Sequence, residues 1–217
     1  MSRIVELRQY TLKPGQRDRL IALFEREFVE SQEAAGIELI GTFRDLDDPD
    51  RFVWMRGFPD MESRARSLAA FYGGPIWKAH REAANATMAD SDNVLLLRPA
   101  WDGSGILGER HVPAPAGIVT VTICPVDLAA TQAMVDRFRR ALTRPAATGS
   151  RVAGVFVTES SPNTFPALPV REGENVFLWI SRVDGQTEPS LPAGTENLVT
   201  PSQILHLSPT SRSRLQA

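Results

Sequence analysis

The chain has 217 residues, of which 42% are hydrophobic and 23% charged, a composition that supports a globular fold with a sizeable core. Its formal net charge of −2 gives no electrostatic reason to expect nucleic acid or an anionic membrane as partner. A single cysteine, Cys124, excludes a disulfide within the chain, and no apolar stretch approaches the roughly 20 residues of a membrane span, so we expect a cytoplasmic protein.

The chain opens with a strand and a helix. Residues 4–11 have strand character and end at the turn formed by residues 13–15. Residues 16–33 follow with apolar side chains at the spacing of one helix face, namely Leu20, Leu23, Phe24 and Phe28. Gly36 is placed to end this helix as its C-cap.

A hairpin and a second helix come next. Residues 37–44 and 51–58 are predicted strands, and the Asp and Pro content of residues 45–50 between them is typical of a tight turn. Residues 60–72 are predicted to be helical, with Asp60 as the N-cap.

Gly73, Gly74 and Pro75 interrupt that helix, and a third helix is predicted from Pro75 to about Met88. A strand over residues 93–98 completes the order β-α-β-β-α-β, which is the ferredoxin-like arrangement.

The pattern then restarts after a Gly- and Pro-rich linker. Strands are predicted at residues 118–123, 152–158, 176–183 and 204–207, and a helix at residues 131–142. We therefore predict an α+β chain with a domain at residues 1–100, a linker at 101–116, a second and degenerate ferredoxin-like domain at 117–209, and a C-terminal tail at 210–217.

The second copy is shorter than the first. Trp54 and its neighbours resemble the stretch around Trp179, which aligns the two copies. In the second copy, residues 184–201 show no helical period where the first has its third helix. We expect that this helix has been lost, which directs the search for function to the first copy.

Polar side chains share one face of the predicted first-copy sheet. On the alternation of strands, the shared face carries Arg8, Tyr10, Phe52, Trp54 and Arg56. We expect this face to pack against a second sheet, in the second copy or in another chain. Two interpretations stay open: Arg8, Tyr10 and Arg56 line a ligand pocket, or the arginines form buried ion pairs with Glu6 or Glu38.

The region from Tyr72 to Met88 carries the most unusual set of side chains. Its candidate site residues are Tyr72, Trp77, His80, Arg81, Asn85 and Met88. Trp77 and His80 lie on one stripe of the predicted third helix, and Arg81, Asn85 and Met88 lie on the neighbouring stripe. They could line a pocket for a small anion or carbonyl compound, with His80 as general acid or base. Alternatively, Trp77 and Met88 are core residues, and His80 and Arg81 pair with carboxylates.

Three stretches resemble the NIPSNAP family: ELRQYTLKPG at residues 6–15, FRDLDDPDRFVW at residues 43–54 and FYGGPIWKAHREAANATM at residues 71–88. Residues 4–99 match well, and residues 117–209 match only in pattern. The resemblance implies a dimeric α+β barrel, in which two ferredoxin-like units pack their antiparallel sheets face to face. Relatives with that barrel include quinol and haem-degrading monooxygenases and lactone isomerases.

Two functions remain open at this stage. The first is a cofactor-free monooxygenase or isomerase that binds a small aromatic or carbonyl compound, with no cofactor and no metal. The second is a non-catalytic protein-interaction module. In either case we expect a homodimer or larger homo-oligomer, since sheet edges favour self-association.

Overall fold

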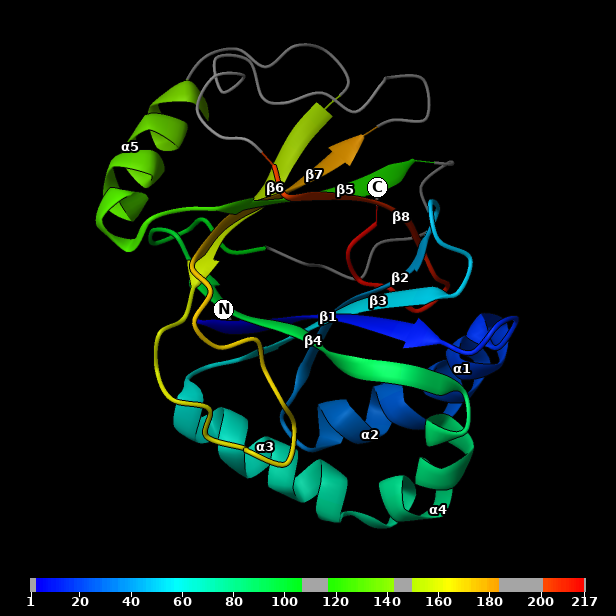
Figure 1. Cartoon of the computed structure of the whole chain (residues 1–217). Helices are drawn as coiled ribbons and strands as arrows, with labels where there is room; N and C mark the ends of the chain where they lie inside the picture. Colours follow the sequence, from blue (N-terminus) through cyan, green and yellow to red (C-terminus); the bar gives the residue numbers. More distant parts are fainter. Residues whose placement is uncertain (1–2, 107–116, 143–149, 184–200, 217) are drawn as a thin grey trace.

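A computed structural model describes residues 3–106, 117–142, 150–183 and 201–216. Eight antiparallel strands close into one barrel in the order β1-β3-β2-β8-β5-β7-β6-β4 (Figure 1). The strands are β1 (Ile4–Leu12), β2 (Glu38–Asp45), β3 (Arg51–Phe58), β4 (Met88–Pro99), β5 (Ile118–Pro125), β6 (Ser150–Thr158), β7 (Val176–Val183) and β8 (Gln203–Pro209). The helices are α1 (Arg17–Leu23), the π-helix η1 (Phe24–Phe28), α2 (Val29–Ala34), α3 (Met61–Gly73), α4 (Pro75–Asn85), the 3₁₀ turn η2 (Leu128–Ala130) and α5 (Thr131–Leu142).

Both halves of the chain use the same strand order. The first half runs β4-β1-β3-β2 and the second β8-β5-β7-β6, so that each has its first and third strands at the centre. The halves join at their edges, where β2 pairs with β8 and β4 pairs with β6. The expected pair of sheets facing each other is thus one continuous barrel, closed within a single chain.

Each half has a glycine at a matching shift of strand register. The register shifts at Gly41 in β2 and at Gly154 in β6. A Cβ atom at Gly41 would lie 2.4 Å from the ring of Phe43, and one at Gly154 would lie 2.8 Å from the ring of Phe156. Each phenylalanine is fully buried, so its ring takes the space that a side chain would need.

Two layers of core lie on opposite faces of the first-half strands. Val5 and Leu7 of β1 and Val53 and Met55 of β3 face the barrel interior. The alternate residues of the same strands pack under α1–α4, which cover this half in Figure 1. The face that carries Arg8, Tyr10 and Arg56 therefore lies beneath the helices, and the expectation that it packs against a second sheet is wrong. The physical reason is that the other face is mostly apolar and its buried Gln9 exchanges hydrogen bonds with Gln203 of β8, so that this face fills the barrel interior at little electrostatic cost.

Several predicted boundaries are corrected around the second and third helices. Tyr72 lies in the last turn of α3, which ends at Gly73, and Gly74, with extended backbone at φ −76° and ψ 163°, separates α3 from α4. Helix α4 stops at Asn85, because Met88 already pairs with Leu12 in the barrel. The predicted break at Gly73, Gly74 and Pro75 is confirmed, whereas the third helix, predicted to run to about Met88, is shorter and is followed by the start of a strand.

The π-helix η1 interrupts the helix predicted over residues 16–33. Other local predictions are confirmed: Asp60 accepts a 2.6 Å hydrogen bond from the Ser63 backbone N–H at the start of α3, and Gly36 has φ +83° at the end of the preceding helix. In the second half, Phe138 of α5 packs on Phe177 and Trp179.

Most of the region of the predicted helix loss, residues 184–200, and most of the linker, residues 107–116, lie outside the described residues. The described part of the predicted tail packs on the first half: the Thr210 N–H bonds to Thr42, the Leu215 N–H bonds to Ile40, and Leu215 is fully buried. Within the described part of the chain, no helix is long and apolar enough to cross a membrane.

Candidate functional site

One buried carboxylate holds three arginines beneath the helices of the first half. Glu6 of β1 lies directly opposite Arg56 of β3 in the strand register. Glu6 Oε2 accepts from Arg8 at 2.7 Å and from Arg56 Nε at 2.8 Å, and Glu6 Oε1 accepts from Arg64 Nε of α3 at 2.7 Å. All four side chains are at most 1% exposed. We call these four residues the arginine cluster.

The arginine cluster has an excess of positive charge. Burial opposes ionisation of Glu6, but the charges of Arg56, Arg8 and Arg64 outweigh it and hold the pKa of this carboxyl well below its usual range. Burial, together with the neighbouring Arg56 and Arg8, lowers the pKa of Arg64 in spite of Glu6. One carboxylate against three guanidinium groups leaves two positive charges in a buried environment. Such an excess is costly unless another anion binds there.

Part of this charge lacks hydrogen-bond partners. Arg56 Nη2, Arg64 Nη2 and the indole Nε1 of Trp54 are buried and donate to no atom of the described residues. Buried donors of this kind are rare in folded proteins and cost on the order of 1–3 kcal/mol each. Unpartnered donors on two arginines that share the Glu6 carboxylate are what a bound carboxylate or oxyanion would satisfy.

Aromatic rings form the walls around the arginines. The guanidinium of Arg8 lies 5.4 Å from the ring centres of both Tyr10 and Trp54, and that of Arg56 lies 5.0 Å from Trp54 and 5.8 Å from Tyr72. Arg8 Nε also donates to the Tyr10 hydroxyl at 3.0 Å, and burial raises the pKa of that phenol, so it stays protonated. The site thus combines cationic donors with flat apolar surfaces.

Residues on the covering helices orient Arg56. Gln32 of α2 donates from Nε2 to the carbonyl of Phe28, the last residue of the π-helix, at 3.2 Å. This fixes Gln32 Oε1, which accepts from Arg56 Nη1 at 3.2 Å, while the Tyr72 hydroxyl lies 3.4 Å from the same nitrogen. The π-helix therefore helps to set the direction of Arg56.

The second half carries no such charge at the matching places. Where β1 and β3 pair Glu6 with Arg56, β5 and β7 pair Thr120 with Ser181. Where β1 and β3 pair Arg8 with Trp54, β5 and β7 pair Thr122 with Trp179. Thr120, Thr122 and Ser181 are all buried. Because one half of the barrel folds with small hydroxyl residues there, the barrel does not require the arginines of the other half.

The residues predicted on α4 separate into two groups. Trp77 is half-buried and packs on Tyr72 and Phe28. His80 is 31% exposed, with its Nε2 3.4 Å from Glu27 Oε2, and its ring lies against Phe28. Arg81 and Asn85 are exposed.

The structure thus gathers Arg8, Tyr10, Arg56 and Tyr72 at the arginine cluster. It places Trp77 beside them, and no described contact joins His80, Arg81 or Asn85 to the cluster. Met88, also predicted, is partly buried at the start of β4 and packs against the same apolar core. The contacts of Trp77 and Met88 agree with the alternative that these are core residues. The contact of His80 with Glu27 agrees with the alternative that His80 pairs with a carboxylate.

Sequence reasoning missed Arg64 and the segment that covers it. Arg64 is buried on α3 together with Leu68 and Phe71, at the i, i+4, i+7 spacing of the inward face, and this spacing could have identified it. Residues 159–175, between β6 and β7, reach α3 from the second half; we call them the strap (Figure 1). Asn163 Oδ1 and Thr164 Oγ1 of the strap accept from Arg64 at 3.0 and 3.3 Å.

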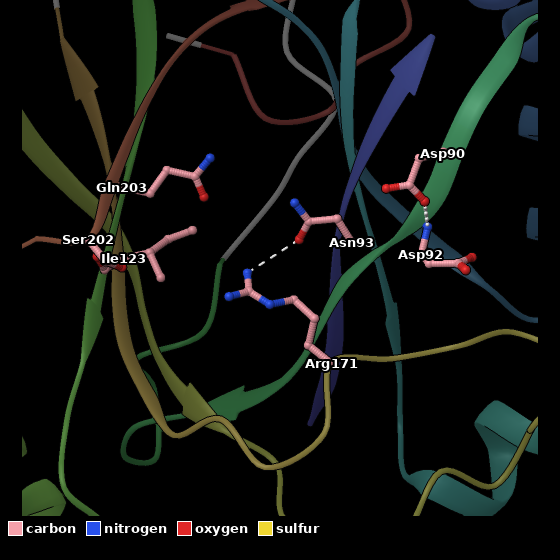
Figure 2. Close-up of a pocket in the computed structure, with 7 residues that line it drawn as sticks. All are labelled: Asp90, Asp92, Asn93, Ile123, Arg171, Ser202 and Gln203. Atoms are coloured by element: carbon pink, nitrogen blue, oxygen red, sulfur yellow. Dashed lines mark hydrogen bonds between the residues drawn. The ribbon is translucent and has the colours of Figure 1, made fainter.

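A hollow of about 520 Å³ lies elsewhere, between β4, the end of the strap and the start of β8 (Figure 2). It is open and polar, and is lined by Asp90, Asp92, Asn93, Ile123, Arg171, Ser202 and Gln203. Arg171 donates to Asn93 Oδ1 at 3.3 Å and also pairs with Glu174. None of the predicted site residues lines this hollow. Among the described residues, no group of three or more His, Cys, Asp or Glu side chains could hold a metal ion.

Comparison with known proteins identifies the first half. The family model described as NIPSNAP matches residues 5–101. A solved NIPSNAP-like domain protein from Burkholderia xenovorans is 31% identical over 44% of this chain and 84% of its own, with a TM-score of 0.41. No curated protein matches the sequence.

Two solved structures are similar over almost the entire chain. A candidate monooxygenase from Lactobacillus acidophilus NCFM aligns with a TM-score of 0.63 and 13% identity over 96% of this chain and 94% of its own. A second candidate monooxygenase, from Fusobacterium nucleatum subsp. nucleatum ATCC 25586, aligns with a TM-score of 0.62 and 9% identity over 99% and 95%. At this level of identity the similarity shows the fold alone.

Proposed function

Because this chain belongs to the NIPSNAP family through residues 5–101, we propose that it binds a small aromatic or carbonyl compound between the first-half sheet and its helices. Arg8, Tyr10, Arg56 and Tyr72 would hold the oxygen atoms of this compound, and the rings of Trp54 and Trp77 would pack on its apolar part. The observation that carries the proposal is the surplus of buried guanidinium donors around Glu6.

The matching positions in the second half make a purely structural role for these arginines a poor explanation. Thr122 and Ser181 stand where the first half has Arg8 and Arg56, in the same strand pairing and equally buried. Retaining two charged residues where small hydroxyl residues suffice costs desolvation energy. A ligand with a partly or fully negative oxygen would offset that cost.

The narrower proposal is that the protein acts on this compound as a cofactor-independent monooxygenase or isomerase. Both reaction classes can begin with an enolate or phenolate, and buried guanidinium donors stabilise such an oxyanion. Glu6 is a poor proton acceptor, because the three arginines lower its pKa. His80 stays the candidate acid or base, a role that requires it to approach the ligand from α4.

A binding experiment tests the proposal. A panel of phenols, quinols and 1,3-diketones would be titrated by calorimetry against the wild type, Arg56→Gln and the matched control Ser181→Ala. We expect at least one compound to bind, with an affinity about tenfold lower or worse in Arg56→Gln and unchanged in Ser181→Ala. Equal affinities for a folded Arg56→Gln variant, or no binding across the panel, would refute the proposal. Oxygen consumption and NMR of the bound compounds test the two reactions.

A non-catalytic interaction module is the second candidate, and the outer surface of α4 favours it. Ile76 is 39% exposed there, and Arg81 and Asn85 of the same helix are exposed as well. An apolar side chain among polar ones is compatible with a protein contact. If Ile76→Asp and Arg81→Glu leave binding of the panel unchanged but prevent self-association measured by sedimentation, α4 is an interface and the arginine cluster is a separate site.

The remaining expectations extend the same proposal. We infer that the two halves are tandem ferredoxin-like units, an inference supported by their equal strand order and by the matching Gly41 and Gly154. A cytoplasmic location and a homodimer or larger homo-oligomer stay predictions from the sequence. Sedimentation of the complete chain tests the assembly.

A further inference from the structure

We propose that the ligand carries a carboxylate, and that this carboxylate binds Arg64 and Arg56 in the place now taken by oxygen atoms of the strap, so that the strap is the moving cover of the site. This inference rests on the proposed function, since it specifies the charge of the ligand and the way in. Four observations carry it: the free donors, the oxygens that stand in for a ligand, the anchoring of the strap, and the rings beside it.

Arg56 and Arg64 each have an unpartnered donor beside the same carboxylate. Arg56 and Arg64 both contact Glu6, on its two different oxygens, and each keeps a buried Nη2 that donates to no described atom. Two guanidinium groups held by one carboxylate present their remaining N–H groups in fixed directions. A second carboxylate, with two oxygens that each accept more than one hydrogen bond, matches these donors, whereas an alcohol or an amide offers one oxygen and no charge.

The strap supplies neutral oxygens at the same guanidinium. Arg64 Nη1 donates to Asn163 Oδ1 and to Thr164 Oγ1, which are carbonyl and hydroxyl oxygens. Both are weaker partners for a guanidinium than a charged oxygen is. Thr164 is exposed and Asn163 is half-buried, so that this part of the strap is the layer between solvent and Arg64. A ligand carboxylate can therefore reach Arg64 by replacing these two oxygens.

The strap is fixed by backbone hydrogen bonds at its ends and held by side chains between them. Glu159 donates from its backbone to Leu96, and Arg171 to Val94, which fixes both ends on β4. Among the described residues, no backbone-to-backbone hydrogen bond joins residues 160–170 to the first half. In that middle section the polar contacts to the first half are those with Arg64 and a 3.0 Å bond from Thr164 to the Met61 carbonyl. The remaining contacts are apolar, from Phe165, Leu168 and Val170 to the core beneath the helices. The middle section can therefore move without breaking a backbone hydrogen bond to the first half.

Aromatic side chains lie next to the part of the strap that covers Arg64. The Phe165 ring of the strap stacks on Tyr72, with 5.9 Å between centres and 26° between planes. Tyr72 in turn contacts Trp77 at 4.8 Å and lies beside the guanidinium of Arg56. When the strap moves away, Tyr72 loses a stacked ring that a flat ligand can replace. The geometry therefore favours an aromatic carboxylate, with its ring on Tyr72 and its charge on Arg64.

The test uses benzoate and its neutral analogue benzamide with the full chain, at concentrations up to 10 mM and constant ionic strength. We expect benzoate to bind at least about tenfold more tightly than benzamide. Arg64→Gln is expected to remove this difference. Asn163→Ala is expected to tighten benzoate binding by about fivefold, because Arg64 loses a competing acceptor and the strap loses the bonds of Asn163 to the Phe165 N–H and the Leu168 carbonyl. Ser161→Ala, elsewhere in the strap, is the matched control and should leave the affinity unchanged.

Hydrogen–deuterium exchange follows the strap directly. Saturation with benzoate should speed exchange of residues 160–170 in the wild type, because the strap leaves Arg64, and benzamide should not. Equal binding of the two probes, or an unchanged or weaker benzoate affinity in Asn163→Ala, would overturn this inference while leaving the proposed function intact, as would unaltered exchange. If benzoate, benzamide and the panel of phenols, quinols and diketones all fail to bind, the proposed function fails as well.

Discussion

Glu6 of β1 and Arg56 of β3 face each other across two neighbouring strands, and a 2.8 Å hydrogen bond joins Glu6 Oε2 to Arg56 Nε. The pair is fully buried, and the carboxylate is shared with Arg8 and Arg64. The stability of this half of the barrel thus depends on one negative charge, and the proposed ligand binding depends on the positive charge that remains.

Removal of the Glu6 charge should destabilise the protein strongly. In Glu6→Gln, three buried guanidinium groups lose their shared counter-ion, and the expected loss is on the order of 3–5 kcal/mol in the free energy of unfolding. Urea unfolding followed by far-UV circular dichroism measures it. The control is Glu62→Gln, which removes an exposed partner of Arg66 and should cost less than about 1 kcal/mol. A loss of similar size in both variants would mean that the arginine cluster is not held by Glu6.

The same carboxylate predicts a pH dependence with a defined sign. The three arginines hold the pKa of Glu6 below its usual range in the folded protein, against burial. The contribution of Glu6 to the free energy of unfolding is therefore complete above the ordinary glutamate pKa of about 4.3. It declines as the pH falls below that value, since the unfolded chain then binds a proton that the folded chain does not.

The comparison of two proteins isolates this effect from that of other carboxylates. Unfolding free energies of the wild type and Glu6→Gln, measured from pH 7 to pH 2, should differ by a constant amount down to about pH 5 and then converge. A difference that stays constant down to pH 2 would show that Glu6 titrates normally in the folded state.

Local patterns predicted much of this fold and part of the site. Strand alternation placed Arg8, Tyr10 and Arg56 on one face, and the N-cap Asp60 and the turn at Gly36 were identified from short-range chemistry. Alternation could not tell which face the helices cover, since both faces contain large apolar residues. The assignment follows from closure of the barrel by β2–β8 and β4–β6 pairs, which depend on residues distant in sequence.

The contacts of Arg64 show why the rest of the site could not be predicted. Its partners Glu6, Asn163 and Thr164 lie 58, 99 and 100 positions away in the sequence. The strap has no period that would assign it to the first half, and its position is set by where β6 and β7 end. The emphasis on α4, by contrast, came from a concentration of unusual residue types, two of which, Arg81 and Asn85, are exposed.

His80 provides a direct test of the sequence-based hypothesis against the geometry. The sequence hypothesis is that His80→Ala abolishes ligand binding without unfolding the protein. The structure places His80 partly exposed beside Glu27 and Phe28, so we expect a stability change below about 1 kcal/mol and an unchanged affinity for compounds that bind at Arg56. Calorimetry of His80→Ala and of the exposed neighbour Lys78→Ala decides between them. A tenfold loss of affinity in His80→Ala, with none in Lys78→Ala, would show that His80 takes part in ligand binding.

The paired glycines predict equivalent damage in the two halves. In Gly41→Ala the new methyl group would meet the ring of Phe43, and in Gly154→Ala that of Phe156; each ring is fully buried and has little room to move. Overpacking of this kind costs roughly 1–3 kcal/mol, and we expect both variants to unfold at lower urea concentration. Gly73→Ala is the control, because nothing lies within 4 Å of the added atom at the end of α3, and it should be neutral. If only one of the two strand variants is destabilised, the two irregularities do not serve the same purpose, and the case for tandem copies of one unit loses this support.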